Sequence, residues 1–212
     1  MSIMKKITFS NIKNKFIIYL EKARGIDFLM VATTDDLGYK LGEGYHSSPS
    51  GNQDIKTILL DLSITHIDSI IDIGSGKGSA LVTMCKFPFK RISGVELSKE
   101  MFDIALQNIK ILKLQSVSIY NNDATKFEYY KEYNIFYMYN PFPSPIMKLV
   151  MKELNNIGKD KKDEIIIIYN HPTCHTDILD GGVFSKIKGY STTHNKKMFI
   201  YSNKNIKDSR LC

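Results

Sequence analysis

The sequence predicts an α/β fold, a doubly wound and mostly parallel seven-stranded sheet that ends in an antiparallel hairpin. Three observations favour it. Strand-like apolar runs alternate with helical runs through the middle of the chain, and a glycine-rich turn follows the first of these strands. Two further strands then close the chain with no helix between them. Finally, a run that is apolar throughout, such as 165–168, is typical of a strand covered on both faces.

The elements follow from apolar periodicity and turn signals, taken in chain order. The expected strands are 69–73, 91–96, 116–120, 134–139, 164–169, 183–190 and 197–202. The expected helices repeat apolar residues at three and four positions and fill 77–86, 98–113 and 144–156. Ser98 is a suitable cap for the second helix, because its hydroxyl can accept a backbone N–H of the first turn.

Residues 1–66 precede the first core strand, and we expect them to form a helical substrate cover within the same domain as a core at 67–212. An amphipathic helix is predicted near the start from apolar residues spaced by three and four, namely Phe9, Ile12, Phe16, Leu20 and Ala23. Residues 1–25 carry six Lys or Arg against Glu21 alone, which gives +5 of the formal +7. A solvated helix face and a surface for nucleic acid, anionic lipid or acidic protein both remain open.

Composition is that of one ordinary globular domain, with 212 residues, 43% hydrophobic and 24% charged. No apolar run approaches the roughly 20 residues of a membrane span, and polar residues interrupt any signal-peptide core. Cys85, Cys174 and Cys212 are odd in number and lack C-x-x-C spacing, which disfavours a disulfide framework or a zinc site. We therefore expect a cytoplasmic protein without a bound metal.

The segment at 70–96 reads IIDIGSGKGSALVTMCKFPFKRISGVE, a strand, a glycine-rich turn, a helix and a second strand that ends on an acid. Glycines in the turn allow sharp bends and close approach of the backbone to a ligand. Asp72 lies at the carboxyl end of the first strand, where open α/β sheets bind ligands. Glu96 follows Gly74 by 22 positions (96 − 74), near the spacing of about 20 at which an acid reaches ribose hydroxyls. The segment therefore predicts an adenosine site.

The turn fits a pyrophosphate or triphosphate poorly. Ser79 stands where a dinucleotide fingerprint needs its third glycine, and Ile71 stands where a P-loop needs its first. Asp72 would repel a phosphate but attract an ammonium group at short range. These features favour a cofactor with a positively charged amino acid part.

The pattern D-x-G-x-G-K-G, followed by GVELS and by a later D-A-T and N-P-F, resembles the class I S-adenosylmethionine (SAM) dependent methyltransferases. The resemblance covers about residues 45–202 and looks most like a small bacterial group without an assigned substrate. It implies SAM as the cofactor, with the first acid and the glycines at its methionine part, the second acid at the ribose and Asp123 with Ala124 at the adenine. The implied cofactor-binding residues are Asp72, Gly74, Ser75, Gly76, Glu96, Leu97, Asp123, Ala124 and Asn140. A simple capping role for Asp123 remains open.

The segment YNPFP at 139–143 is similar to the N-P-P-[YF] motif of family members that methylate planar nitrogens. The resemblance implies that Asn140 and Phe142 are catalytic, the asparagine oxygen and the next carbonyl accepting the amine hydrogens while the aromatic ring stacks on the target. Phe142 replaces the second proline, so nitrogen is only favoured as the target atom. Prolines that merely end a strand and open a helix are the alternative.

These motifs together predict an enzyme that transfers the SAM methyl group to an unidentified acceptor, with a nitrogen of a protein side chain or small molecule favoured. An RNA methyltransferase is the first alternative, although no recognised RNA-binding module accompanies the basic N-terminus. A non-catalytic SAM-binding protein is the second, because fold alone does not confer activity. The resemblance also places Tyr45, His46, Ser47 and Ser50 near the cofactor mouth, and His171 is a candidate base or a loop-stabilising residue.

Overall fold

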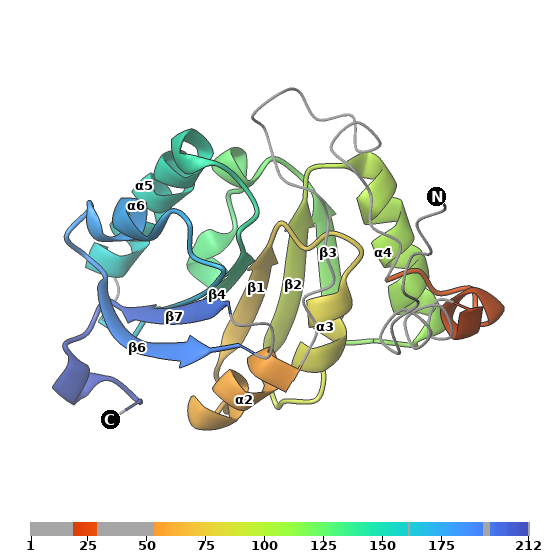
Figure 1. The fold of residues 1–212 in the computed structure, drawn as a ribbon, viewed down its shortest axis with the longest axis horizontal. Helices are drawn as coiled ribbons and strands as arrows, with labels where there is room; N and C mark the ends of the chain where they lie inside the picture. Colours follow the sequence, from red (N-terminus) through yellow and green to blue (C-terminus); the bar gives the residue numbers. More distant parts are fainter. Residues whose placement is uncertain (1–18, 29–52, 161, 193–195, 212) are drawn as a thin grey trace, which may run out of the picture.

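The computed structural model describes residues 19–28, 53–160, 162–192 and 196–211, and it shows the predicted seven-stranded α/β sheet (Figure 1). The strands are β1 (Ser69–Ile73), β2 (Arg91–Glu96), β3 (Val117–Asn121), β4 (Ile135–Tyr139), β5 (Ile166–Asn170), β6 (Ser185–Ser191) and β7 (Lys197–Ser202). The helices are α2 (Gln53–Asp61), α3 (Ser79–Met84), α4 (Lys99–Ile111), α5 (Ser144–Asp160) and α6 (His175–Leu179). Short 3-10 turns lie at Ala124–Lys126, Tyr130–Glu132 and Ile206–Asp208.

The strand order is β3-β2-β1-β4-β5-β7-β6. The first five strands along the chain pair in parallel, whereas β7 runs antiparallel to both β5 and β6. The prediction of a mostly parallel sheet with a C-terminal antiparallel hairpin is therefore confirmed. In this order β1 and β4 lie side by side although two strands separate them in sequence, so the sheet changes winding direction between them. Open α/β sheets bind ligands outside the carboxyl ends of the strands at such a point.

Helices cover both faces of the sheet and define two hydrophobic cores (Figure 1). On one face α2 and α3 pack through residues such as Ile55 and Leu81 against β1, β4 and β5. On the other face α5 and α6 pack with aromatic residues such as Tyr133 and Phe136. Every residue of β1 and β5 is buried, which explains why Ile165 and the residues after it form a continuous apolar run.

Five helix boundaries differ from the predicted ones, at both ends of α3 and α4 and at the end of α5, and two of them have a visible cause. Helix α3 begins at Ser79 rather than at 77, because Gly78 has a φ of 82° and belongs to the turn. Helix α5 continues to Asp160 rather than ending at 156, since Gly158 packs against the segment before β6: a Cβ there would lie 2.8 Å from Cγ1 of Val183. The five-residue helix α6 was not predicted, because so short a segment carries too little periodicity.

The N-terminal region is described only in part. Residues 19–23 are helical, while most of the predicted amphipathic helix and Tyr45, His46, Ser47 and Ser50 lie outside the described residues. The segment after this helical turn docks on α4: the Asp27 amide donates to Asn108 Oδ1 at 3.0 Å, and Asn108 Nδ2 donates to the Asp27 carbonyl at 2.9 Å. The domain division at residue 66 stays a prediction.

Within the described part of the chain, no helix is both long enough and apolar enough to cross a membrane. The same residues contain no cluster of three or more His, Cys, Asp or Glu side chains that could hold a metal ion. Cys85 and Cys174 are free thiols.

Candidate cofactor and acceptor site

The glycine-rich turn folds back onto the end of β2. The amides of Gly74 and Ser75 both donate to the Val95 carbonyl, at 2.9 and 3.1 Å. Gly74 has a φ of 77°, a backbone conformation that side chains disfavour. A Cβ on Gly74 would also lie 2.6 Å from Cβ of Pro141, which follows β4. Glycine is therefore required here both by the turn and by the close approach of the chain after β4.

Glu96 ties the turn to the start of α4. Its Oε2 accepts the Gly76 amide at 2.8 Å and its Oε1 accepts the Ser98 amide at 2.9 Å, with only 3% of the residue exposed. Each carboxylate oxygen has a second acceptor position, so ligand hydroxyls could still bind to Glu96. The carboxylate is thus held in one orientation by backbone donors before any ligand arrives.

Lys77, also in the turn, is engaged by a protein carboxylate and is not placed to bind an anionic ligand. Its Nζ lies 2.7 Å from Asp27 Oδ2, and only 5% of its side chain is exposed. The Lys77 carbonyl accepts Asn108 Nδ2 at 3.0 Å. The docked segment that contains Asp27 therefore braces the turn from outside, a contact that no local sequence signal reveals.

Asp72 is a buried carboxyl at the end of β1. Its Oδ2 has no hydrogen-bond partner among the described residues, and neither does Ser75 Oγ. Burial, together with the nearby charge of Glu96, raises the pKa of Asp72 to about 8. Buried polar atoms in native proteins are normally hydrogen-bonded, so two such atoms at one turn fit a site that is completed by a polar ligand. A cationic ammonium would also favour the ionised form of Asp72.

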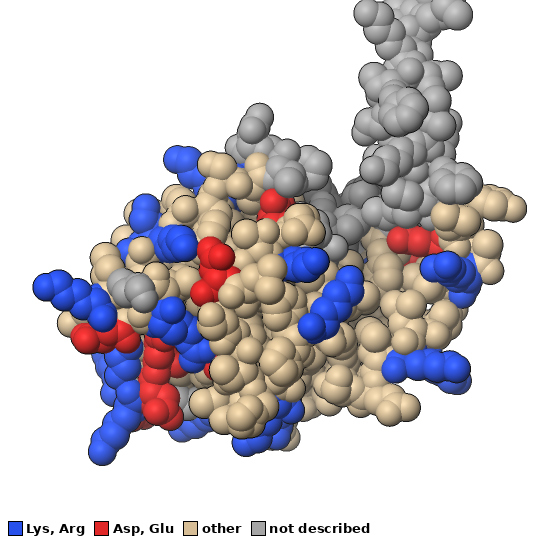
Figure 2. Space-filling view, turned by 90° about the horizontal axis from the view of Figure 1, so that it is seen from below, with Lys and Arg blue, Asp and Glu red and all other residues tan. Residues whose placement is uncertain are grey.

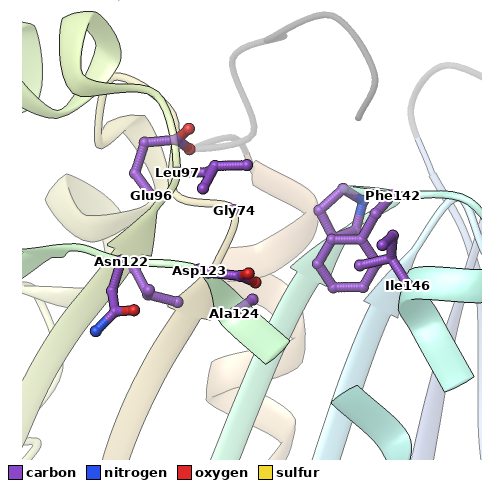
Figure 3. A pocket seen from close by; sticks show the side chains of 10 residues that line it. Gly74, Glu96, Leu97, Asn122, Asp123, Ala124, Phe142 and Ile146 are labelled. Carbon is purple, nitrogen blue, oxygen red and sulfur yellow. The ribbon is translucent and has the colours of Figure 1, made fainter. Parts of the chain in front are cut away.

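A cavity of about 230 Å³ opens between the ends of β1, β2, β3 and β4. Its lining residues are Gly74, Val95, Glu96, Leu97, Asn122, Asp123, Ala124, Pro141, Phe142 and Ile146. Figure 3 shows Glu96 and Leu97 on one side of the cavity, and Phe142 and Ile146 on the other side. The cavity thus joins the glycine turn and the second-strand acid to the chain that follows β4.

Asp123 caps a short turn and also lines the cavity. Its Oδ1 accepts the Thr125 amide at 2.8 Å and the Thr125 hydroxyl at 2.7 Å. Burial by itself would raise the pKa of Asp123, but the hydrogen bonds from Thr125 and the charge of Lys126 outweigh it and lower the pKa. The capping interpretation is therefore correct, and the ionised carboxylate still lies at the cavity wall.

Asn140 and Phe142 occupy different positions. Phe142 is buried and lines the cavity, whereas Asn140 does not line it. Asn140 Oδ1 accepts the Tyr169 hydroxyl at 3.1 Å and also the Thr173 hydroxyl. Asn140 has a φ of 42°, in the left-handed region, where non-glycine residues are uncommon and often functional.

The structure brings together six of the predicted site residues at the cavity wall, namely Gly74, Glu96, Leu97, Asp123, Ala124 and Phe142. Asp72, Ser75, Gly76 and Asn140 lie outside this lining. The prediction did not include Val95, Asn122, Pro141 or Ile146, which also line the cavity. Val95, Asn122 and Pro141 each lie next to a predicted site residue in the sequence, which was the signal that could have found them. Ile146 reaches the cavity from the first turn of α5.

Residues 67–152 match a family model described as putative methyltransferase. Among solved structures, the chain is similar to a SAM-dependent methyltransferase from Aquifex aeolicus, with a TM-score of 0.59, 12% identity, and coverage of 71% of this chain and 90% of that one. It is also similar to a SAM-dependent O-methyltransferase from Thermotoga maritima, with a TM-score of 0.57, 16% identity, and coverage of 74% and 72%. A third similar structure is magnesium protoporphyrin IX methyltransferase from Synechocystis with bound SAM, with a TM-score of 0.54, 14% identity, and coverage of 70% of this chain and 76% of that one.

The solved structures establish the fold, and the family match covers residues 67–152, less than half of the chain. The fold and this partial family match agree with the predicted class of SAM-dependent methyltransferases.

Proposed function

We propose that this protein is a SAM-dependent methyltransferase, which binds SAM in the cavity between Glu96 and Phe142 and transfers its methyl group to an acceptor nitrogen held beside Phe142. One observation carries the proposal: a single cavity is lined by the glycine turn, by the acid after β2 and by Pro141 and Phe142 after β4. The two motifs that the sequence offered for cofactor and acceptor therefore meet at one place.

On the cofactor side, the chain supplies three carboxyl groups with different roles. Glu96, held by two backbone amides, would accept the ribose hydroxyls. Asp123 would accept the adenine amine, and Asp72 would pair with the ammonium of the methionine part, whose charge would keep it ionised. When bound, SAM supplies a methyl group on a positively charged sulfur, which needs no further activation.

On the acceptor side, Phe142 would place a planar nitrogen by stacking, since its buried ring lines the cavity. Asn140 is already bonded through Oδ1 to Tyr169 and Thr173. Hydroxyls accept as well as donate. A half-turn of the amide would let Nδ2 donate to the same two hydroxyls and would release Oδ1 for an amine hydrogen. Positioning of this kind can supply most of the catalysis in a one-step displacement.

The discriminating variant is Asn140→Ala, with Asn156→Ala on the exposed side of α5 as the matched control. We expect Asn140→Ala to leave SAM affinity within about twofold but to lower methyl transfer about 100-fold, the order expected for a misplaced acceptor. Calorimetry measures the affinity, and labelled SAM in native lysate measures the transfer. Equal loss of binding and transfer would contradict the role of Asn140.

The wild-type protein tests the activity itself. SAM binding without label transfer to any lysate component would favour a non-catalytic SAM-binding protein. Transfer to RNA, with binding that weakens steeply as salt rises, would favour an RNA methyltransferase, because phosphate contacts release counterions. We propose the cytoplasm as its compartment, where Cys85 and Cys174 would stay reduced.

A further inference from the structure

A second cavity, of about 590 Å³, lies beside the first, where β5 ends and β7 begins. We call it the basic cleft and define it by Lys186, Lys196, Lys197, His171, His175 and Thr173. None of the described residues that line it is acidic. All of its charged lining groups therefore have the same sign.

The lysines of the basic cleft are not neutralised by neighbours. Among the described residues, none of the three makes an ion pair with a carboxylate, whereas nearby Lys188 pairs with Asp61 at 3.1 Å. Aromatic rings support two of them instead: Lys186 Nζ lies 4.4 Å from the centroid of Phe199. Lys196 Nζ lies 5.5 Å from the centroid of the Tyr139 ring. Cation–π contacts restrain an ammonium group but leave its charge uncompensated.

The two histidines respond to that charge. Burial lowers the pKa of His171, and Lys196 lowers it further. Burial and Lys186 lower the pKa of His175 in the same way, and its Nδ1 lies 2.7 Å from the Tyr201 hydroxyl. Both imidazoles are therefore neutral at neutral pH and can offer an N–H donor beside the lysine charges.

One hydrogen bond links the basic cleft to Asn140, the candidate acceptor residue. Thr173 lines the cleft, and its hydroxyl bonds to Asn140 Oδ1. Asn140 and His171 follow the paired residues Tyr139 and Asn170 at the ends of adjacent strands. Both have a left-handed backbone, with φ values of 42° and 54°. Asn and His are among the residues that adopt this conformation most readily, and here it places both residues at one edge of the sheet.

We propose that the basic cleft binds a phosphate or carboxylate group of a small-molecule methyl acceptor, whose reacting nitrogen then extends past Asn140 to Phe142. This inference rests on the proposed function and specifies its substrate class. An open hollow of about 590 Å³ has room for a small ligand. A nucleic acid backbone would instead need basic side chains along a stripe. The face drawn in Figure 2, seen from below, carries no such stripe on its coloured part, because its Lys and Arg side chains are interspersed with acidic and uncharged ones.

The first test measures anion binding by calorimetry, with inorganic pyrophosphate and citrate as separate probes for the two chemistries. The variant is Lys186→Ala/Lys196→Ala/Lys197→Ala, and the matched control removes three exposed lysines elsewhere, Lys110→Ala/Lys152→Ala/Lys207→Ala. We expect the cleft variant to bind at least one probe about tenfold more weakly than the control does. Equal weakening in both, or no binding of either probe to the wild type, would overturn the proposal.

The second test locates the acceptor by labelling a lysate that has been separated into small molecules, RNA and protein. We expect label in the small-molecule fraction, to be lost when anion-exchange resin first removes its anions, and to be reduced in the cleft variant. Label in RNA or protein alone would overturn the proposal while leaving methyl transfer intact. Failure of the proposed function is distinguishable, because it would abolish SAM binding or all labelling irrespective of the cleft.

Discussion

The two halves of the sheet present opposite charges at neighbouring sites. Around β1 to β3 the functional groups are carboxyls, Asp72, Glu96 and Asp123, and they surround a glycine turn braced by backbone hydrogen bonds. Around β5 to β7 they are the lysines of the basic cleft, which form no ion pair with a carboxylate among the described residues. Under the two proposals above, the carboxylates of Glu96 and Asp123 favour a cationic cofactor and the lysines favour an anionic acceptor, so charge helps to direct each ligand to its own side.

The functional side chains of the two halves also differ in how firmly the surrounding protein fixes them. Glu96 is fixed by two backbone amides and 3% exposed, whereas Lys196 and Lys197 are exposed side chains at the start of β7. Cofactor binding should therefore depend on fixed geometry, and acceptor binding on charge. The predictions below test that division, from the largest expected effect to the smallest.

The two halves of the sheet meet where Gly74 approaches Pro141. We expect Gly74→Ala to disrupt this contact. The new Cβ would lie 2.6 Å from Pro141 on a backbone with a φ of 77°. We expect a loss of about 3 kcal/mol in the free energy of unfolding, from backbone strain plus overpacking. Gly182→Ala is the control, since its φ is 64° but nothing lies within 4 Å, and it should cost only about 1 kcal/mol. Urea unfolding measures both, and equal losses would show that the contact is unimportant.

Glu96→Ala should weaken SAM binding about 100-fold, or ~2.7 kcal/mol, by removing charged hydrogen bonds to the ribose and leaving two backbone amides unpaired. Its matched control is the exposed Glu128→Ala, which should bind as the wild type does. Calorimetry measures the SAM affinity of both variants. If pyrophosphate binding also fell in Glu96→Ala, the two halves would not be independent.

Asp72→Asn should stabilise the ligand-free protein at neutral pH while weakening SAM binding. Folding raises the Asp72 pKa from an ordinary 3.8 to about 8, so the folded state binds more protons than the unfolded state between these values. Stability therefore falls as pH rises from about 4 to 8. The asparagine variant lacks this loss, and we expect it to gain about 1–2 kcal/mol at pH 8. Urea unfolding at a series of pH values measures the gain, and parallel curves for both proteins would refute the assignment.

Local patterns in the sequence predicted all seven strands and every described helix of the core except α6, and they proposed a cofactor site within one stretch of chain. The fully buried strands gave continuous apolar runs, and the turn with Asp72, Gly74 and Glu96 has its ligand chemistry within one stretch of chain. Asp123 illustrates a mixed outcome, because its capping contacts with Thr125 are local while its place at the cavity wall depends on how β3 lies beside β2.

The sequence by itself determined the order of strands and helices, the glycine turn and the acid after β2, because each depends on neighbours a few residues away. Only the tertiary structure decided that β7 lies between β5 and β6, that Asp27 reaches Lys77, and that Lys186 and Lys197 share one cleft with His171. These arrangements join segments far apart in the chain through packing and charge, and no local periodicity records which distant segments will meet.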